Sequence, residues 1–155
     1  MSQPQSRNRR SILGAALALP AGLAVGGLAT AAPAAAAEAG VTADPWVDLA
    51  LEPGITPTAG ATPQVRVVTI AGTAFLQARG QITGSWTADT KIATLPAGFP
   101  LPTWYVRATV PRNNSQGINA CRFEINPAGS VTIYGANTGN PITWVQLDSA
   151  QAIWR

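Results

Sequence analysis

The chain has 155 residues and a formal net charge of +3; 46% of the residues are hydrophobic and 11% are charged, with one cysteine and no histidine. Without histidine, the chain lacks Ser-His and Cys-His nucleophile systems, the usual zinc sites and the commonest general base. With a single cysteine, Cys121, it cannot form a disulfide within itself.

Residues 1–37 are predicted to be an export signal. Three arginines stand among the first ten residues, and an uncharged apolar segment rich in Ala and Gly covers residues 12–28. Ala35, Ala36 and Ala37 are small enough for a signal peptidase, so we expect cleavage after Ala37, with Ala31 and Ala34 as competing sites. This is the order of zones in a cleaved signal, with a retained membrane anchor as the alternative.

Residues 9–13, Arg-Arg-Ser-Ile-Leu, resemble the twin-arginine export motif. The match departs at Asn8, where Ser or Thr is usual, at Ile12, where Phe is usual, and at Gly14, where Lys is common. The apolar segment is interrupted by Pro20 and several glycines, which weakens membrane partition, so we expect no membrane span after cleavage. The resemblance implies a twin-arginine signal and a secreted, extracellular protein; ordinary secretion is the alternative.

The charge of the chain after residue 37 is balanced. Residues 38–155 keep seven basic and seven acidic side chains, so their net charge is zero. This excludes nucleic-acid binding through a basic patch, which needs a clustered surplus of Lys and Arg. We expect a flexible lead at 38–45 and one domain at 46–155.

The domain is predicted to be all-β. Runs rich in β-branched and aromatic residues alternate with turn clusters, and no window shows a convincing helical period. The predicted strand runs are 46–51, 64–70, 74–86, 104–110, 120–125, 130–134 and 142–148. Residues 71–73 are a candidate tight turn, 126–129 suit a hairpin, and Gly80 and Gly84 mark a bulge or bend. Short strands at this spacing favour an antiparallel β-sandwich, jelly-roll-like.

Side-chain alternation within the strands assigns their faces. It places Cys121 in the core, and it turns Trp104 and Val106 inward. The outward set is rich in aromatic residues and arginines, the composition of a contact surface. Five of these side chains are the candidate ligand-binding residues: Phe75, Tyr105, Arg107, Tyr134 and Trp144. Ordinary core packing and a subunit interface are the alternatives for this set.

No catalytic residue, metal site or cofactor is predicted. The only lysine, Lys91, has no Ser three residues before it, and neither a calcium loop nor a phosphate loop is present. Pairs of carboxylates such as Glu124 and Asp148 leave a glycoside-active enzyme as a weak alternative. We expect no enzymatic activity.

A longer pattern carries a family resemblance. Its stretches are "VRVVTIAGTAFLQARGQITG", "IATLPAGFPLP", "CRFEINPAGSVTIY" and "ITWVQLDSAQAIW". Together they resemble the receptor-binding β-sandwich at the ends of phage tail fibres. The match spans residues 46–154 and departs at 78–79 and 100–102. The matching positions are Arg66, Leu76, Gly80, Leu95, Pro96, Gly98, Phe99, Ile125, Gly129, Val131, Trp144 and Leu147.

The resemblance implies a trimeric jelly-roll-like head that binds cell-surface glycans or polymers. A twin-arginine leader is foreign to phage tails, so a secreted bacterial relative is the more careful interpretation. The sequence therefore predicts a secreted binding module for a surface polysaccharide or cell-wall polymer. A structural domain that forms a homo-oligomer is the alternative.

Overall fold

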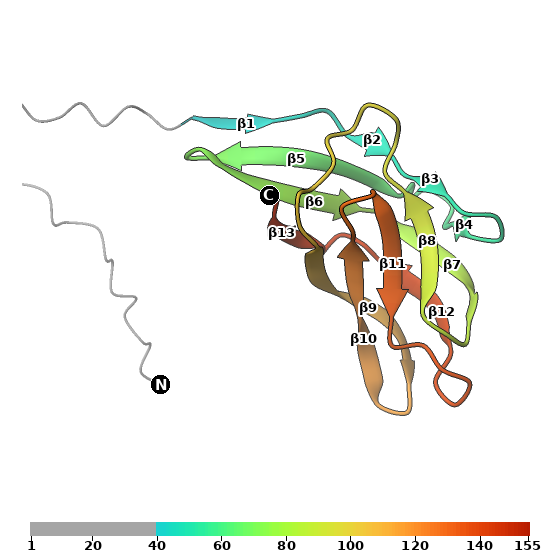
Figure 1. Ribbon diagram of the computed structural model, residues 1–155. Coiled ribbons are helices and arrows are strands. Elements are labelled where there is room, and N and C mark those ends of the chain that lie inside the picture. Colours follow the sequence, from blue (N-terminus) through green and yellow to red (C-terminus); the bar gives the residue numbers. More distant parts are fainter. Residues whose placement is uncertain (1–39) are drawn as a thin grey trace, which may run out of the picture. The chain divides into compact units, whose positions relative to one another are not determined.

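The computed structural model describes residues 40–155, so the predicted signal at 1–37 lies outside the described residues. The described chain is all-β: thirteen strands form two antiparallel sheets, as predicted (Figure 1). The smaller sheet has the order β1 (Val41–Ala43), β5 (Gln64–Ile70), β6 (Thr73–Arg79), β13 (Gln151–Ile153), with β2 (Val47–Asp48) also on β5. None of the described residues forms a helix that could span a membrane.

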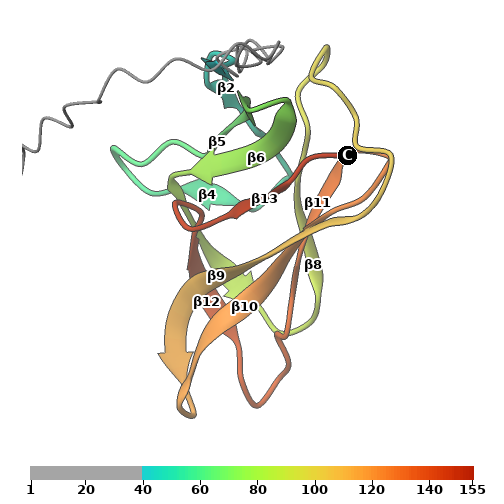
Figure 2. The ribbon, with the colours of Figure 1, turned by 90° about the vertical axis from the view of Figure 1, so that its left-hand side faces the viewer.

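The larger sheet has eight strands. Their order is β3 (Ala50–Leu51), β8 (Thr90–Thr94), β11 (Ser130–Tyr134), β10 (Ile118–Ile125), β9 (Val106–Ser115), β12 (Ile142–Gln146), β7 (Gln81–Trp86), β4 (Thr56–Pro57). Although β7 and β8 stand near opposite ends of this order, only residues 87–89 join them. The four steps from Trp86 to Thr90 span about 14 Å at most, so the sheet must curl back on itself toward a barrel. Figure 2 shows this curvature below the smaller sheet.

The core fills the space between the two sheets. The smaller sheet contributes fully buried Val65 and Leu76, and the larger sheet contributes Phe123, Ile133 and Val145. Alternating positions along each strand supply these residues, as period-2 geometry requires. The prediction that Cys121 is a core thiol is confirmed, since it is 6% exposed and belongs to the same cluster.

Two predicted turns are confirmed. Ala71 and Gly72 both have positive φ, 51° and 78°, and join β5 to β6 as a two-residue hairpin. This is the conformation of a type I′ turn, whose twist matches that of the flanking strands. In the second turn the Asn126 side-chain oxygen accepts hydrogen bonds from the backbone of Ala128 and Ser130, which closes the β10–β11 hairpin.

The chain passes from the smaller sheet to the larger one at Gly80. This glycine has φ of 95° and lies between β6 and β7. A Cβ here would stand 2.3 Å from the carbonyl oxygen of Thr62, so only glycine fits. The predicted bend in the long 74–86 run is therefore confirmed, and it is the corner of the sandwich.

A second corner is hydrogen-bonded to the first. After β12 the chain returns to the smaller sheet through residues 147–150, where Leu147 N donates to Gly80 O at 2.7 Å. The Asp148 carboxylate accepts from Gly80 N at 3.0 Å. These hydrogen bonds link the two segments in which the chain passes between the sheets, at Gly80 and at residues 147–150.

The structure differs from the sequence-based expectation near the start of the domain. Residues 41–43 lie in the segment expected to be a flexible lead, yet they pair with β5 as exposed edge strand β1. The predicted run 46–51 is split into β2 and β3, which belong to different sheets on either side of buried Leu49. Both differences follow from which strands pair through their backbones, and the alternation of apolar and polar side chains does not reveal that pairing.

Candidate ligand-binding surface

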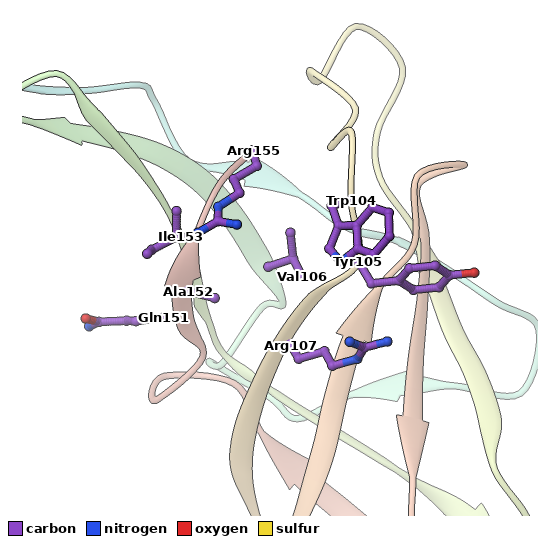
Figure 3. Close-up of a pocket in the computed structure, with 8 residues that line it drawn as sticks. All are labelled: Trp104, Tyr105, Val106, Arg107, Gln151, Ala152, Ile153 and Arg155. Atoms are coloured by element: carbon purple, nitrogen blue, oxygen red, sulfur yellow. The ribbon is translucent and has the colours of Figure 1, made fainter.

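A pocket of about 370 Å³ opens between the start of β9 and the edge strand β13. Its polar and aromatic lining comes from two distant parts of the chain (Figure 3). The lining residues are Trp104, Tyr105, Arg107, Gln151, Ile153 and Arg155, completed by Val106 and Ala152. A hydrogen bond of 2.5 Å from Thr103 N to Arg155 O joins the two segments.

Two large aromatic side chains are exposed at this pocket. Trp104 is 65% exposed and Tyr105 is 44% exposed, and their rings meet edge to face with centroids 6.4 Å apart. The prediction that Trp104 points inward is therefore wrong. Regular strand β9 begins only at Val106, so strand alternation does not extend back to position 104.

Beside the pocket, Glu124 on β10 organises the outer face of the larger sheet. Its carboxylate accepts hydrogen bonds from Arg107 Nε at 2.6 Å and from the Tyr134 hydroxyl at 3.1 Å, and Arg122 Nε lies 3.7 Å away. Register explains the gathering, because Glu124 is directly opposite Arg107 on β9 and next to the Arg122–Tyr134 pair. Glu124 is only 5% exposed, so this ion-pair partner is buried.

The electrostatics of this group favour an ionised Glu124. Burial alone would raise its pKa, but the hydrogen bonds from Arg107 and Tyr134 and the nearby arginine charges outweigh burial and lower the pKa. Burial, followed by the bond to Glu124, raises the pKa of the Tyr134 phenol. The carboxylate is thus negative and the phenol neutral across the physiological range.

The arginines of this face also stack on its tyrosines. Arg107 Cζ lies 5.2 Å from the ring centroid of Tyr105, and Arg122 Cζ lies 3.9 Å from that of Tyr134. Such cation–π contacts help to hold the guanidinium groups over the rings. We call Tyr105, Arg107, Arg122, Glu124 and Tyr134 the β9–β11 cluster.

The structure brings three of the five predicted site residues together: Tyr105, Arg107 and Tyr134 all belong to the β9–β11 cluster. Phe75 lies on β6 of the smaller sheet, half-buried, as the register partner of Ile153, and it does not line the pocket. Trp144 is half-buried on β12, opposite Thr83 of β7, and is likewise absent from the pocket lining. The predicted set thus spans both sheets.

Sequence reasoning missed Trp104, Gln151 and Arg155 as members of the surface. Gln151 and Arg155 flank the last strand, and no local pattern joins them to residues 104–107. The one available signal for Trp104 was its place beside Thr103 and the prolines at 100 and 102, which argue against a regular strand there.

The carboxylates considered for glycoside cleavage have other roles. Asp148 accepts hydrogen bonds from Gln146 at 2.8 Å and from the Gly80 backbone at 3.0 Å, and these bonds lower its pKa. Glu124 is also shifted toward the ionised form. A general acid needs the opposite shift. No group of three or more His, Cys, Asp or Glu within residues 40–155 has the arrangement to hold a metal ion.

The described fold is similar to those of solved phage protein structures. No family model matches the chain, and no curated protein matches it. Among solved structures, it is similar to the receptor binding protein (gp15) of Listeria phage PSA, with a TM-score of 0.52, 16% identity, and coverage of 76% of this chain and 67% of that one. It also matches the receptor-binding head domain of the lactococcal phage bIL170, with a TM-score of 0.47, 16% identity, and coverage of 72% and 98%. The described domain therefore has a fold like that of the Listeria phage protein.

Proposed function

We propose that this protein is an exported, non-enzymatic binding module that recognises a cell-surface carbohydrate polymer through the β9/β13 pocket and the adjoining β9–β11 cluster. The observation that carries the proposal is the exposure of Trp104 and Tyr105 on one pocket that also holds Arg155 and Gln151.

The chemistry of the pocket suits a sugar. The apolar face of a pyranose stacks on an aromatic ring, while guanidinium and amide groups donate hydrogen bonds to its hydroxyls. Trp104 supplies the ring, and Arg155 supplies guanidinium donors from the opposite wall (Figure 3). Arg107 is already held by Glu124, so its position is set before a ligand arrives.

The comparisons support a binding role. The Listeria phage protein is, by its name, a receptor binding protein, and its fold is shared here at low sequence identity. A glycan as the receptor is our extension of that likeness. The signal predicted at residues 1–37 agrees with it, since a surface polymer is met outside the cell.

Glycan-array binding by the mature domain tests this function. We expect Trp104→Ala and Tyr105→Ala each to weaken binding of a retained glycan about tenfold, as for the loss of one well-packed aromatic contact. Ile118→Ala is the matched control, because Ile118 is 48% exposed but absent from the pocket lining. Trp144→Ala tests whether the face extends to β12. Equal glycan binding by wild type and both pocket variants would contradict the proposal.

Export is tested separately. Replacing Arg9 and Arg10 with Lys is expected to leave the protein in the cytoplasm, and mass spectrometry of the exported wild type is expected to show Glu38 at its N-terminus. Export of the double variant at the wild-type level would exclude the twin-arginine route.

A second candidate is assembly of copies through the same surface. Exposed apolar residues favour it, since Leu101 is 58% exposed and Ile153 48%, beside Trp104. The family resemblance implies a trimer. Light scattering after size exclusion decides: a stable oligomer that Trp104→Ala dissociates supports assembly, whereas a monomer with intact glycan binding supports recognition.

A further inference from the structure

The outer face of the smaller sheet carries a second group of charged and aromatic side chains, remote in sequence from the pocket. Trp46 lies half-buried just before β2, and two arginines converge on its ring. Arg66 Cζ from β5 is 4.4 Å from the ring centroid, and Arg79 Cζ from β6 is 4.3 Å from it. Two like charges are therefore held close together.

In the described part of the chain neither arginine forms an ion pair with a carboxylate, although the positive charge of Arg79 contributes to the lowered pKa of Asp148. Within residues 40–155 the ion pairs under 4 Å involve Lys91, Arg107 and Arg122, but not Arg66 or Arg79. Bringing two guanidinium groups without a carboxylate partner onto one indole costs electrostatic energy, which an anion bound to both of them would recover.

The two guanidinium groups are also fixed in orientation. Arg66 Nε donates to Gln77 Oε1 at 2.9 Å, and Arg79 Nε donates to Gln64 Oε1 at 2.7 Å. In the described part of the chain the terminal Nη groups of both side chains donate to nothing. Each arginine therefore keeps the two amino groups that bind an oxyanion, while its Nε is committed to the protein.

Two carboxylates at the edge of this group set the charge of the ligand. Asp48 accepts from Gln64 Nε2 at 2.6 Å, and Asp148 lines a surface hollow of about 540 Å³ that also includes Gln64 and Arg79. Their negative charges disfavour a ligand with several charges. We infer that Arg66, Arg79 and Trp46 form a second site, which binds a singly charged oxyanion group such as a phosphodiester or a carboxylate.

Nuclear magnetic resonance of the arginine Nε–Hε groups tests the site on the folded domain. Dimethyl phosphate represents the phosphodiester and sodium glucuronate the carboxylate, each compared with sodium chloride at equal ionic strength. We expect saturable shifts of the Arg66 and Arg79 signals with at least one oxyanion and not with chloride. A response to one probe assigns that ligand class, and a response to both assigns the shared oxyanion chemistry.

Variants complete the test. Arg79→Gln and Arg66→Gln are each expected to weaken the apparent affinity about tenfold, as for one charged donor lost. Lys91→Gln, which removes a cation of the larger sheet that belongs to neither site, is expected to leave the affinity unchanged. Shifts no different from those with chloride, or an unchanged affinity in both Gln variants, would overturn the site. If the variants fail to fold, the wild-type titration alone decides. Trp104→Ala does not change this second site. The oxyanion proposal can therefore fail while the glycan proposal holds, and the reverse, and the two results are distinguishable.

Discussion

The Nη2 amino group of Arg112 donates a hydrogen bond of 2.6 Å to the carbonyl oxygen of Pro141. Arg112 is 1% exposed, and its guanidinium also bonds to oxygens of Asn113 and Asn140 at 3.1 and 2.9 Å. Within residues 40–155 no carboxylate lies within ion-pairing distance of it. A buried cation is thus solvated by carbonyl oxygens, and it fastens the β11–β12 loop to β9.

Replacing this arginine with an apolar residue should be costly. In Arg112→Met several buried carbonyl oxygens lose their donor, so we expect the free energy of unfolding to fall by about 3 kcal/mol. Urea denaturation measures it. Arg155→Gln, at an exposed position, is the control and should change the free energy of unfolding by less than about 0.5 kcal/mol. Equal stability of the two variants would show that the Arg112 contacts are dispensable.

Gly80 should tolerate no side chain. In Gly80→Ala the new Cβ meets the Thr62 carbonyl oxygen at 2.3 Å at a φ of 95°, and we expect a loss of about 3 kcal/mol in unfolding free energy. Gly98→Ala is the matched control: its φ is 82°, but nothing lies within 4 Å of the added Cβ. Gly98→Ala therefore introduces only backbone strain, and we expect its free energy of unfolding to fall by about 1 kcal/mol. Thermal unfolding compares the two, and equal losses would refute the steric argument.

Glu124 should make stability depend on acid pH. Burial alone would raise its pKa in the folded protein, but the hydrogen bonds from Arg107 and Tyr134, together with the charges of Arg107 and Arg122, lower that pKa below the ordinary value of 4.5. A lowered folded pKa gives stability that is present above 4.5 and is lost as the pH falls through the folded value. Glu124→Gln should therefore flatten the acid branch of the stability curve, measured by denaturation at several pH values.

The exposed pair of Glu52 and Lys91 supplies the control for that experiment. Their side chains are 31% and 45% exposed, so Glu52→Gln should alter the acid branch little. An acid branch that persists in full in Glu124→Gln would show that other carboxylates, Asp148 first among them, carry the effect.

Cys121 should be inert in the native protein. Burial raises the pKa of its thiol to about 11, although the positive charge of Arg112 acts in the opposite direction. Since the thiolate is the reactive form, iodoacetamide at about pH 8 should label the urea-unfolded chain and spare the folded one. Mass spectrometry counts the adduct. Rapid labelling of the folded protein, or a disulfide-linked dimer on a non-reducing gel, would contradict the core placement.

Local pattern predicted much of the fold. Cys121 and Val106, which alternation turns inward, are both buried, because strand alternation is a property of a few consecutive residues. The same alternation, continued from Val106 through Val110, points Arg112 inward, but a charged residue at a core position was not expected. Its acceptors come from residues about 30 positions later, which no local pattern reveals.

The candidate site was less predictable, because it depends on which strands become neighbours. Arg107 and Tyr134 were expected on an outer face, but their meeting through Glu124 follows from the order β11, β10, β9. Phe75 was assigned to the same set, yet it lies in the other sheet, since the chain changes sheets at Gly80. Alternation gives a face for each strand and does not say to which sheet that face belongs.

The hydrogen bonds of Gly80 to Leu147 and Asp148 affect how the domain unfolds. Because β6 and β7 are joined only by Gly80, disruption of one sheet reaches the other through this corner. The hydrogen bonds that join Gly80 to Leu147 and Asp148 couple the second crossing to the first. Partial unfolding with one sheet intact would break both crossings at once, so the two sheets should exchange their backbone protons as one cooperative unit. Amides of β6 and β12 should accordingly show equal protection in native-state hydrogen exchange, although they belong to different sheets.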